Sequence, residues 1–348
     1  MEEIMEVLIG GYTMKQSQGI YELSFNSSHK PAQLEEARNI IKVSGPTYFQ
    51  ISKKLLFTID KPNDKEGGIS SYKLIDGRYE KQDHFYTPGS SPAYLGINSK
   101  EKLLYTANYH TGVLSIFKYD EQGKLNLLTS ITHTAQTLGP RPEQIDGAHP
   151  HFFDQTPAGN LVSCDLGNDS VDFYQADKTN KLKHLATYKN EAGFGSRHLV
   201  FSNDGQYFYV TGELSSKVNV VKFNEQDWSF ENIATYSTIP EDWKQHNGAA
   251  AIKISSDGQF IYISNRGNDS IVVFQIQDDH TLRLVQRVST FGSFPRDFNW
   301  DESEKYVVVA NQTTDNATLY SRNSETGCLT VMQKNIRVPE GTRVLFKK

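Results

Sequence analysis

Three Arg, one Glu and one His fall at two recurring places in this 348-residue sequence. They are His151, Arg197, Glu213, Arg266 and Arg296. Guanidinium groups bind phosphate and carboxylate oxygens through paired hydrogen bonds, and His or Glu can take a proton from a water molecule. The set is therefore suited to chemistry on a small anionic substrate, if the fold brings the five side chains together.

The two places belong to a repeated segment, and a repeat of this length decides the fold class. Each copy has a small residue or Pro, a short apolar strand, a turn, and a second strand that usually ends in Asn or Asp. The six copies begin at Pro46, Pro92, Pro150, Ser196, Ala249 and Pro295, in steps of 46, 58, 46, 53 and 46 residues. An alternating third strand follows, and often a fourth. Four short antiparallel strands in about 40 to 50 residues are typical of a β-propeller blade.

Both chain ends lie outside the six copies, and together they supply a seventh. Gly341 lies another 46 residues beyond Pro295 and begins a first strand, while residues 6–12 and 19–25 fit the second and third strands. We therefore predict one all-β domain over residues 1–348, a seven-bladed propeller of four-stranded antiparallel blades. Strands from both termini close the ring, which leaves no open sheet edge. The competing interpretation, a β-sandwich with a second β-domain, requires the repeat to be accidental.

Propeller topology gives the five ionisable residues a common location. The start of the first strand and the end of the second lie at the same end of a blade, and the innermost strands line the central channel. A single charged residue at such a place is most simply part of a surface ion pair. Three Arg side chains together are costly unless an anion shares their charge. The set therefore predicts an anion site at one mouth of the channel.

Two segments of the repeat are almost identical, CDLGNDSVDFY from Cys164 and SNRGNDSIVVF from Ser264. The shared GNDS predicts a turn between the second and third strands of two blades. The residue before the turn is Leu166 in one copy and Arg266 in the other. We expect Leu166 to pack in the core and Arg266 to face the anion site.

Composition and motifs restrict the partners and cofactors. A formal net charge of -5 lacks the basic excess of nucleic-acid-binding proteins, and no apolar segment approaches the roughly 20 residues of a membrane span. The acidic N-terminal residues are unlike a secretory signal, so the cytoplasm is the expected location. No cofactor or metal is expected, because His149 and His151 have no evident third zinc ligand and no GxSxG, GxGxxG, P-loop or HExxH motif occurs. The oligomeric state stays open.

Four longer stretches resemble a known family. They are GAHPH around His151, GSRHLVFSNDGQYFYVTGELSS from Gly195, SSDGQFIYISNRGNDSIVVF from Ser255 and FPRDFNWDESEKYVVVANQ from Phe294. These stretches resemble the seven-bladed β-propeller lactonases, which include cytosolic bacterial 6-phosphogluconolactonases and fungal carboxy-cis,cis-muconate lactonizing enzymes. The likeness runs across nearly the whole chain.

The resemblance implies a set of site residues. The family's active-site His, two Arg and Glu match His151, Arg197, Arg266 and Glu213, although Gly212 replaces the Asn of the family's N-E-L element. The resemblance also makes Arg296, in a P-R-x-F element, a further candidate for substrate binding. His149 and His198, which flank the matched His and Arg in sequence, are candidates on their position.

The resemblance favours metal-independent hydrolysis of a sugar-acid lactone, with 6-phosphogluconolactone of the pentose phosphate pathway as the first candidate. The arginines would bind the phosphate and the developing oxyanion, and one of His149, His151, His198 or Glu213 would act as the base. Two alternatives stay open. One is a muconate-type cycloisomerisation at the same residues, and the other is a non-catalytic propeller that binds an anionic ligand or a protein partner.

Overall fold

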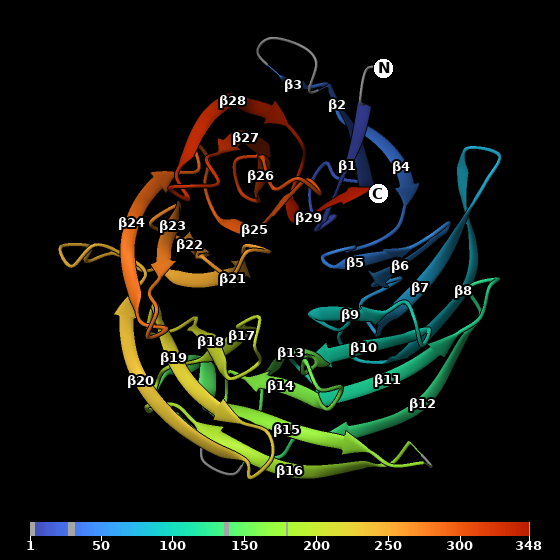
Figure 1. Ribbon diagram of the computed structural model, residues 1–348. Coiled ribbons are helices and arrows are strands. Elements are labelled where there is room, and N and C mark those ends of the chain that lie inside the picture. Colours follow the sequence, from blue (N-terminus) through green and yellow to red (C-terminus); the bar gives the residue numbers. More distant parts are fainter. Residues whose placement is uncertain (1–3, 27–31, 136–138, 179, 348) are drawn as a thin grey trace.

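The computed structural model describes residues 4–26, 32–135, 139–178 and 180–347. Seven antiparallel sheets of four or five strands surround a central axis as blades (Figure 1). The prediction of a seven-bladed, all-β propeller is thereby confirmed. In the described part of the chain, the only helix is the short 3-10 helix η1 (Pro142–Gln144), and no helix is long and apolar enough to cross a membrane.

Six blades follow the chain, each from its innermost to its outermost strand (Figure 1). The first three contain β5 (Phe49–Ser52), β6 (Leu55–Asp60), β7 (Glu66–Ile75) and β8 (Arg78–Pro88); β9 (Tyr94–Asn98), β10 (Leu103–Asn108), β11 (Val113–Tyr119) and β12 (Leu125–Thr132); and β13 (Pro150–Gln155), β14 (Leu161–Asp165), β15 (Ser170–Ala176) and β16 (Leu182–Lys189). The next three contain β17 (Ser196–Phe201), β18 (Tyr207–Gly212), β19 (Lys217–Asn224) and β20 (Ser229–Ser237); β21 (Gly248–Ile254), β22 (Phe260–Arg266), β23 (Ser270–Ile276) and β24 (Leu282–Ser289); and β25 (Pro295–Trp300), β26 (Tyr306–Asn311), β27 (Asn316–Arg322) and β28 (Leu329–Arg337).

Strands from both chain ends form the seventh blade. It contains β29 (Gly341–Lys347), β1 (Ile4–Gly11), β2 (Gly19–Asn26), β3 (Gln33–Leu34) and β4 (Arg38–Lys42). β29 is innermost and pairs antiparallel with β1, with Val7 opposite Phe346 and Ile9 opposite Val344. This pairing of the two chain ends within one blade closes the ring as the sequence predicted.

The burial of the strands follows from their place in a blade. Every side chain of β6 and β26 is buried, because second strands are covered on both faces by neighbouring blades. Outermost strands are less covered: in β24 only Leu282 is buried, and the other residues are partly buried or exposed. The core is therefore a ring of apolar layers between blades.

The turn between the second and third strands joins each blade to the next. In the first GNDS segment, Asp169 adopts a positive φ of 52°. Its backbone carbonyl accepts the N–H of Asn190, just after the fourth strand, at 2.9 Å. Its carboxylate accepts the N–H groups of Gly193 and Gly195 at 2.8 and 2.6 Å. One turn residue thus fixes the segment that leads to Arg197 in the next blade.

The same arrangement recurs in two later blades. The carbonyl of Asp269, at φ 51°, accepts the N–H of Thr290 at 2.9 Å, and its carboxylate accepts that of Phe294 at 2.8 Å. Asp315, at φ 53°, accepts the N–H of Glu340 through its carboxylate at 2.9 Å. These turns position the starts of the inner strands β25 and β29.

The glycines of the two GNDS turns allow two neighbouring loops to approach the turns closely. A Cβ atom on Gly167 would lie 2.0 Å from the carbonyl oxygen of Gly147, and one on Gly267 would lie 2.2 Å from that of His246. Both carbonyls belong to loops before inner strands, residues 139–147 and 238–247, which we call the rim loops. Only glycine lets these loops rest on the turns.

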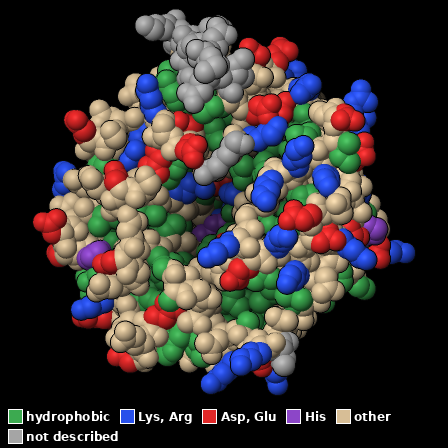
Figure 2. All heavy atoms as spheres, turned by 45° about the vertical axis from the view of Figure 1, so that its right-hand side comes forward, with side chains coloured by type: hydrophobic (Ala, Val, Ile, Leu, Met, Phe, Trp, Pro, Cys, Tyr) green, Lys and Arg blue, Asp and Glu red, His purple; other side chains and the backbone are tan. Residues whose placement is uncertain are grey.

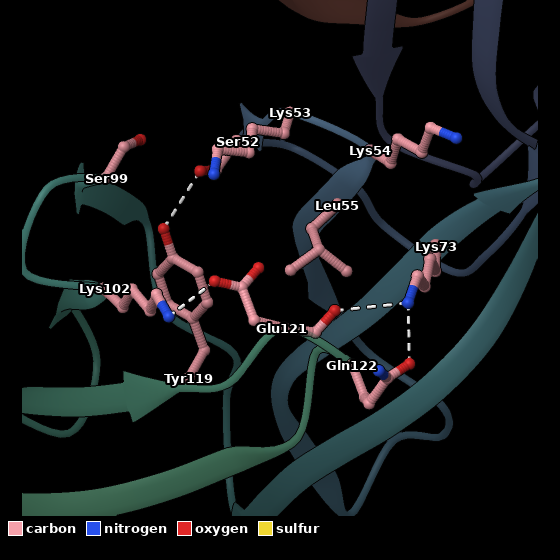
Figure 3. A pocket seen from close by; sticks show the side chains of 10 residues that line it. All are labelled: Ser52, Lys53, Lys54, Leu55, Lys73, Ser99, Lys102, Tyr119, Glu121 and Gln122. Carbon is pink, nitrogen blue, oxygen red and sulfur yellow. Dashed lines mark hydrogen bonds and ion pairs between the residues drawn. The ribbon is translucent and has the colours of Figure 1, made fainter.

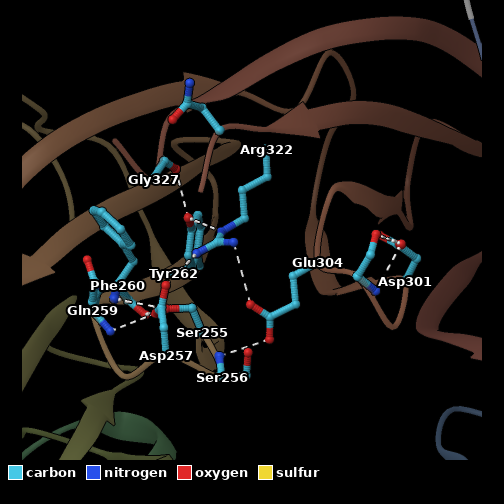
Figure 4. A network of polar contacts seen from close by, with 12 residues as sticks. Ser255, Ser256, Asp257, Gln259, Phe260, Tyr262, Asp301, Glu304, Arg322 and Gly327 are labelled. Atoms are coloured by element: carbon cyan, nitrogen blue, oxygen red, sulfur yellow. Dashed lines mark hydrogen bonds and ion pairs between the residues drawn. The ribbon is translucent and has the colours of Figure 1, made fainter. Parts of the chain in front are cut away.

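A buried arginine links the last two sequential blades (Figure 4). Arg322, at the end of β27, has a side chain that is 3% exposed and donates from Nε to the Tyr262 hydroxyl of the neighbouring blade at 2.7 Å. Tyr262 donates in turn to the carbonyl of Gly327 at 2.7 Å. Glu304 Oε2 lies 3.5 Å from Arg322 Nη1, and Glu304 Oε1 accepts the N–H of Ser256 at 2.9 Å.

Replacing Arg322 with Met should therefore destabilise the propeller without affecting the mouth of the channel. Loss of charge-assisted hydrogen bonds that are shielded from water should cost roughly 2 to 3 kcal/mol and lower Tm by about 5 °C. Arg38→Met is the matched control, because Arg38 pairs with Glu22 through a side chain that is 74% exposed. Equal Tm values for the two variants in thermal unfolding would contradict this role of Arg322.

Candidate active site

Arg197, Glu213 and Arg266 form one contact group at the mouth, the end of the propeller where the first strands begin. Arg197 is the second residue of β17, Glu213 directly follows β18, and Arg266 ends β22 of the next blade. Glu213 Oε2 lies 2.7 Å from Arg197 Nε and 2.9 Å from Arg266 Nη2. One carboxylate oxygen therefore lies between guanidinium groups from two adjacent blades.

Arg197 is the most deeply buried of the arginines at the mouth, with 2% of its surface exposed. Its Nη1 has no hydrogen-bond partner among the described residues. Burial first, and then the charge of Arg266, lower the pKa of Arg197 to about 9. A buried donor without a partner is costly, so the described residues leave the hydrogen bonding of this guanidinium incomplete.

Arg266 is fixed by its own blade. Its Nε and Nη2 donate to the carbonyls of Gly248 and Ala249 at 3.3 and 3.2 Å, and its guanidinium lies 5.3 Å from the ring centre of Phe294. Leu166, at the equivalent place two blades away, is 1% exposed. Burial is the largest cause that lowers the pKa of Arg266, and Glu213 opposes it.

Glu213 and Arg296 complete the charged part of the mouth. Burial raises the pKa of Glu213, but the charges of Arg266, Arg197 and Arg296 together outweigh burial and hold it below its usual value. Arg296, the second residue of β25, donates from Nη1 to the hydroxyl of Tyr12 at 3.3 Å. Glu213 is thus an ionised partner of the arginines.

His151 and His198 form a buried imidazole pair beside this group. His151 Nδ1 lies 3.2 Å from His198 Nε2, and the two residues are 4% and 8% exposed. Burial, followed by the charge of Arg197, lowers the pKa of both residues well below its ordinary value. Both rings are therefore neutral near pH 7, and a neutral imidazole can accept a proton.

His149 is held differently from the other two His residues. Its Nδ1 lies 2.8 Å from the carbonyl of Tyr109 and its Nε2 lies 2.8 Å from the carboxylate of Asp146. The ring stacks on that of Tyr109, with centroids 4.4 Å apart. Both ring nitrogens thus have protein partners. This fits a structural role, in which His149 connects Tyr109 to the loop that contains Asp146, better than a role as a base.

A second polar layer lies one residue further along the inner strands, and our sequence analysis missed it. Arg343 stacks 4.0 Å from the ring centre of Tyr48 and pairs with Asp297 at 2.9 Å. In the same layer, Tyr94 donates to Asp154 at 2.7 Å, and burial raises the pKa of that carboxyl to about 6. The repeat alignment contained the signal, because these residues follow the first place of each copy by one or three positions.

Comparison with known proteins identifies the family of this chain. The model of the family "Lactonase, 7-bladed beta-propeller" matches residues 6–346. The chain belongs to this family. The 6-phosphogluconolactonase of Bacillus subtilis is 34% identical over 345 residues, 97% of each chain. A crystal structure of a protein from Lactobacillus plantarum has a TM-score of 0.94 and 42% identity over 99% of this chain and 100% of that one. The periplasmic gluconolactonase of Pseudomonas aeruginosa has a TM-score of 0.89 and 27% identity over 99% of both chains.

The mouth of this lactonase propeller contains a pocket of about 280 Å³. Arg266 and Glu213 form its inner wall, and the rim loops contribute Arg141, His246 and Asn247. The space-filling view shows the ring hollowed at its centre, with a His side chain visible inside (Figure 2). The pocket is therefore open to a small polar molecule that reaches the arginine group.

A larger pocket, of about 370 Å³, lies at the opposite end of the blades, beside the turns between first and second strands (Figure 3). Its basic residues are Lys53, Lys54, Lys73 and Lys102. Lys102 pairs with Glu121 at 2.6 Å, and Lys73 donates to Gln122 at 2.6 Å. None of the seven candidate residues from the sequence lines this pocket, whereas Glu213 and Arg266 line the pocket at the mouth.

The pKa directions of the His pair lead to a spectroscopic prediction. In a titration from about pH 8 to about pH 5 followed by ¹⁵N–¹H NMR, the His151 and His198 rings should stay neutral through the range in which an ordinary His protonates. Arg296→Gln should raise the pKa of His151, because the Arg296 charge helps to lower it. Protonation of His151 at the ordinary His value in the wild type would contradict the burial of the pair.

Proposed function

We propose that the protein hydrolyses a sugar-acid lactone at the mouth, with 6-phosphogluconolactone as the principal substrate. The observation that carries the proposal is the buried Arg197–Glu213–Arg266 group beside a neutral His151. It provides positive charge for an anion, and His151, whose pKa responds to the charge of Arg197, is the neighbouring base for water. Membership of the lactonase family supports the reaction class, and the name of the Bacillus subtilis relative supports the substrate.

The reaction requires neither a covalent nucleophile nor a metal. Water attacks the ring carbonyl while His151 accepts one of its protons, and the carbonyl oxygen becomes an oxyanion in the tetrahedral intermediate. Arg197 and Arg266 stabilise that charge, and the unpartnered Nη1 of Arg197 is one donor free to do so. The bond to the ring oxygen then breaks, and that oxygen takes the proton back from His151. The product is an open-chain hydroxy acid, whose carboxyl group then releases a proton to water and becomes a carboxylate.

His151 is a better base than Glu213 in this arrangement. Proton transfer to Glu213 would discharge the carboxylate that lies between two guanidinium groups and would leave their repulsion uncompensated. His151 is neutral before the reaction and gains its charge only during it. In this proposal Glu213 holds the two arginines in position, and His198 holds the His151 ring through their shared hydrogen bond.

Two further expectations from the sequence belong to this proposal. The cytoplasmic location stays a prediction, and the Pseudomonas aeruginosa relative is named as periplasmic. The substrate is proposed to be a small phosphorylated or carboxylated anion, with no nucleic-acid or membrane partner.

Arg266→Ala should reduce the rate of lactone hydrolysis by about 10²- to 10³-fold, as loss of an oxyanion donor does in other enzymes. Acid release from 6-phosphogluconolactone is measured against its spontaneous hydrolysis. Arg283→Ala is the matched control, because Arg283 is an exposed residue on β24, the outermost strand of the same blade. Circular dichroism establishes that both variants are folded.

A folded Arg266→Ala variant with the wild-type rate would overturn this site assignment. Wild-type activity on a muconate lactone, without activity on the sugar lactone, would favour the cycloisomerase alternative. Activity on neither substrate would favour a propeller that only binds an anion or a partner.

A further inference from the structure

The relatives differ in what their names say about phosphate. The Bacillus subtilis relative is named for 6-phosphogluconolactone, and the Pseudomonas aeruginosa relative is named for gluconolactone. The two molecules share the lactone ring and differ in a phosphate at the far end. If the inner arginines bind the carbonyl end, a further cation toward the rim of the pocket can bind this phosphate.

Arg141 lies at that place. It lines the same pocket as Glu213 and Arg266, but it belongs to the rim loop of residues 139–147, which comes from a different blade connection. Within the described residues, its guanidinium has no carboxylate within ion-pair distance and no hydrogen-bond partner. It is thus a charge available to a ligand, whereas Arg197 and Arg266 already share Glu213.

The backbone of Arg141 is held rigidly for an exposed residue. Its N–H donates to Gln144 Oε1 at 3.2 Å, and Gln144 is fully buried. Gln144 Nε2 donates in turn to the carbonyl of Leu166 at 2.8 Å and to Asp169 Oδ1 at 2.7 Å. The rim loop is therefore bound to the first GNDS turn, the same turn that fixes the segment before Arg197.

The side chain of Arg141 packs against Gly193. A Cβ atom on Gly193 would lie 3.2 Å from Arg141 Nε and 3.5 Å from its Cγ, so the side chain lies directly over that glycine. Gly193 adopts a φ of +82° and its N–H is held by Asp169. The stem of the Arg141 side chain thus packs on the backbone of Gly193, which restricts where its guanidinium can lie.

We propose that Arg141 is a specificity residue that binds the terminal phosphate of a phosphorylated sugar lactone while the inner arginines bind its carbonyl end. His246, on the facing rim loop and lining the same pocket, is the neighbouring donor. Glu143, two residues from Arg141, also lines the pocket and opposes a phosphate by like-charge repulsion. This inference rests on the lactonase function proposed above.

The test compares two substrates, 6-phosphogluconolactone and glucono-δ-lactone. Arg141→Gln should lower kcat/KM for the phosphorylated lactone by about tenfold, mainly through KM, because one charge-assisted contact is lost. The same variant should hydrolyse glucono-δ-lactone at the wild-type rate. Glu143→Gln should change KM for the phosphorylated lactone in the opposite direction, and Arg283→Ala should change neither substrate.

The outcomes separate this inference from the function on which it rests. The phosphate assignment is overturned if Arg141→Gln keeps the wild-type KM for 6-phosphogluconolactone, or if its kcat/KM falls equally for both lactones. Either result leaves the lactonase function standing. Wild-type protein that hydrolyses neither lactone overturns the function. In that case calorimetry with 6-phosphogluconate and gluconate still decides the subsite. Tighter binding of the phosphorylated acid, lost in Arg141→Gln, supports it, and equal binding of the two acids overturns it.

Discussion

In three blades, hydrogen bonds from the turn after the second strand hold the approach to the next blade. An Asp in a left-handed conformation, as at Asp169 and Asp269, uses its carbonyl to hold the end of its own blade and its carboxylate to hold the approach to the next. A propeller has few contacts between blades that are distant in the ring, so these local bonds decide where each inner strand begins. His151, Arg197 and Arg296 are the second residues of inner strands, so the turns before β17 and β25 help to set the positions of the two arginines.

Electrostatics at the mouth is the second constraint. Arg197 and Arg266 are almost fully buried, and burial of like charges is stable only when an opposite charge lies between them. Glu213 supplies that charge, but its single shared oxygen leaves Arg197 Nη1 without a partner. Burial, and after it the charge of Arg197, lowers the pKa of His151 and keeps its ring neutral. The arginines at the mouth thus add to an effect that burial begins.

Much of this could be predicted from sequence because each blade repeats one pattern. The alignment gave the starts of β13, β17 and β25 at Pro150, Ser196 and Pro295, which are the first residues of those strands. It also gave the closure by both termini. It missed the layer of Tyr48, Asp297 and Arg343. The copies of the repeat were compared at the residue just before each of these, and not at the next position. It missed Arg141 for a different reason: this residue lies in a connection outside the repeat, and only the contact of Gln144 with the GNDS turn brings it to the pocket.

The sequence by itself determined the architecture and the list of ionisable groups. Alternating strands and evenly spaced turns permit few folds, and unlike residues at equivalent positions stand out against a repeat. Only the tertiary structure decided how those groups act on one another, since charge, burial and proton affinity depend on distances between blades. His149, His151 and His198 are indistinguishable as letters. In the fold, the first has partners on both nitrogens, while the other two form a neutral pair beside the arginines. The GNDS turns show the same division: their residues predict a turn, and their contacts make that turn the support of the mouth.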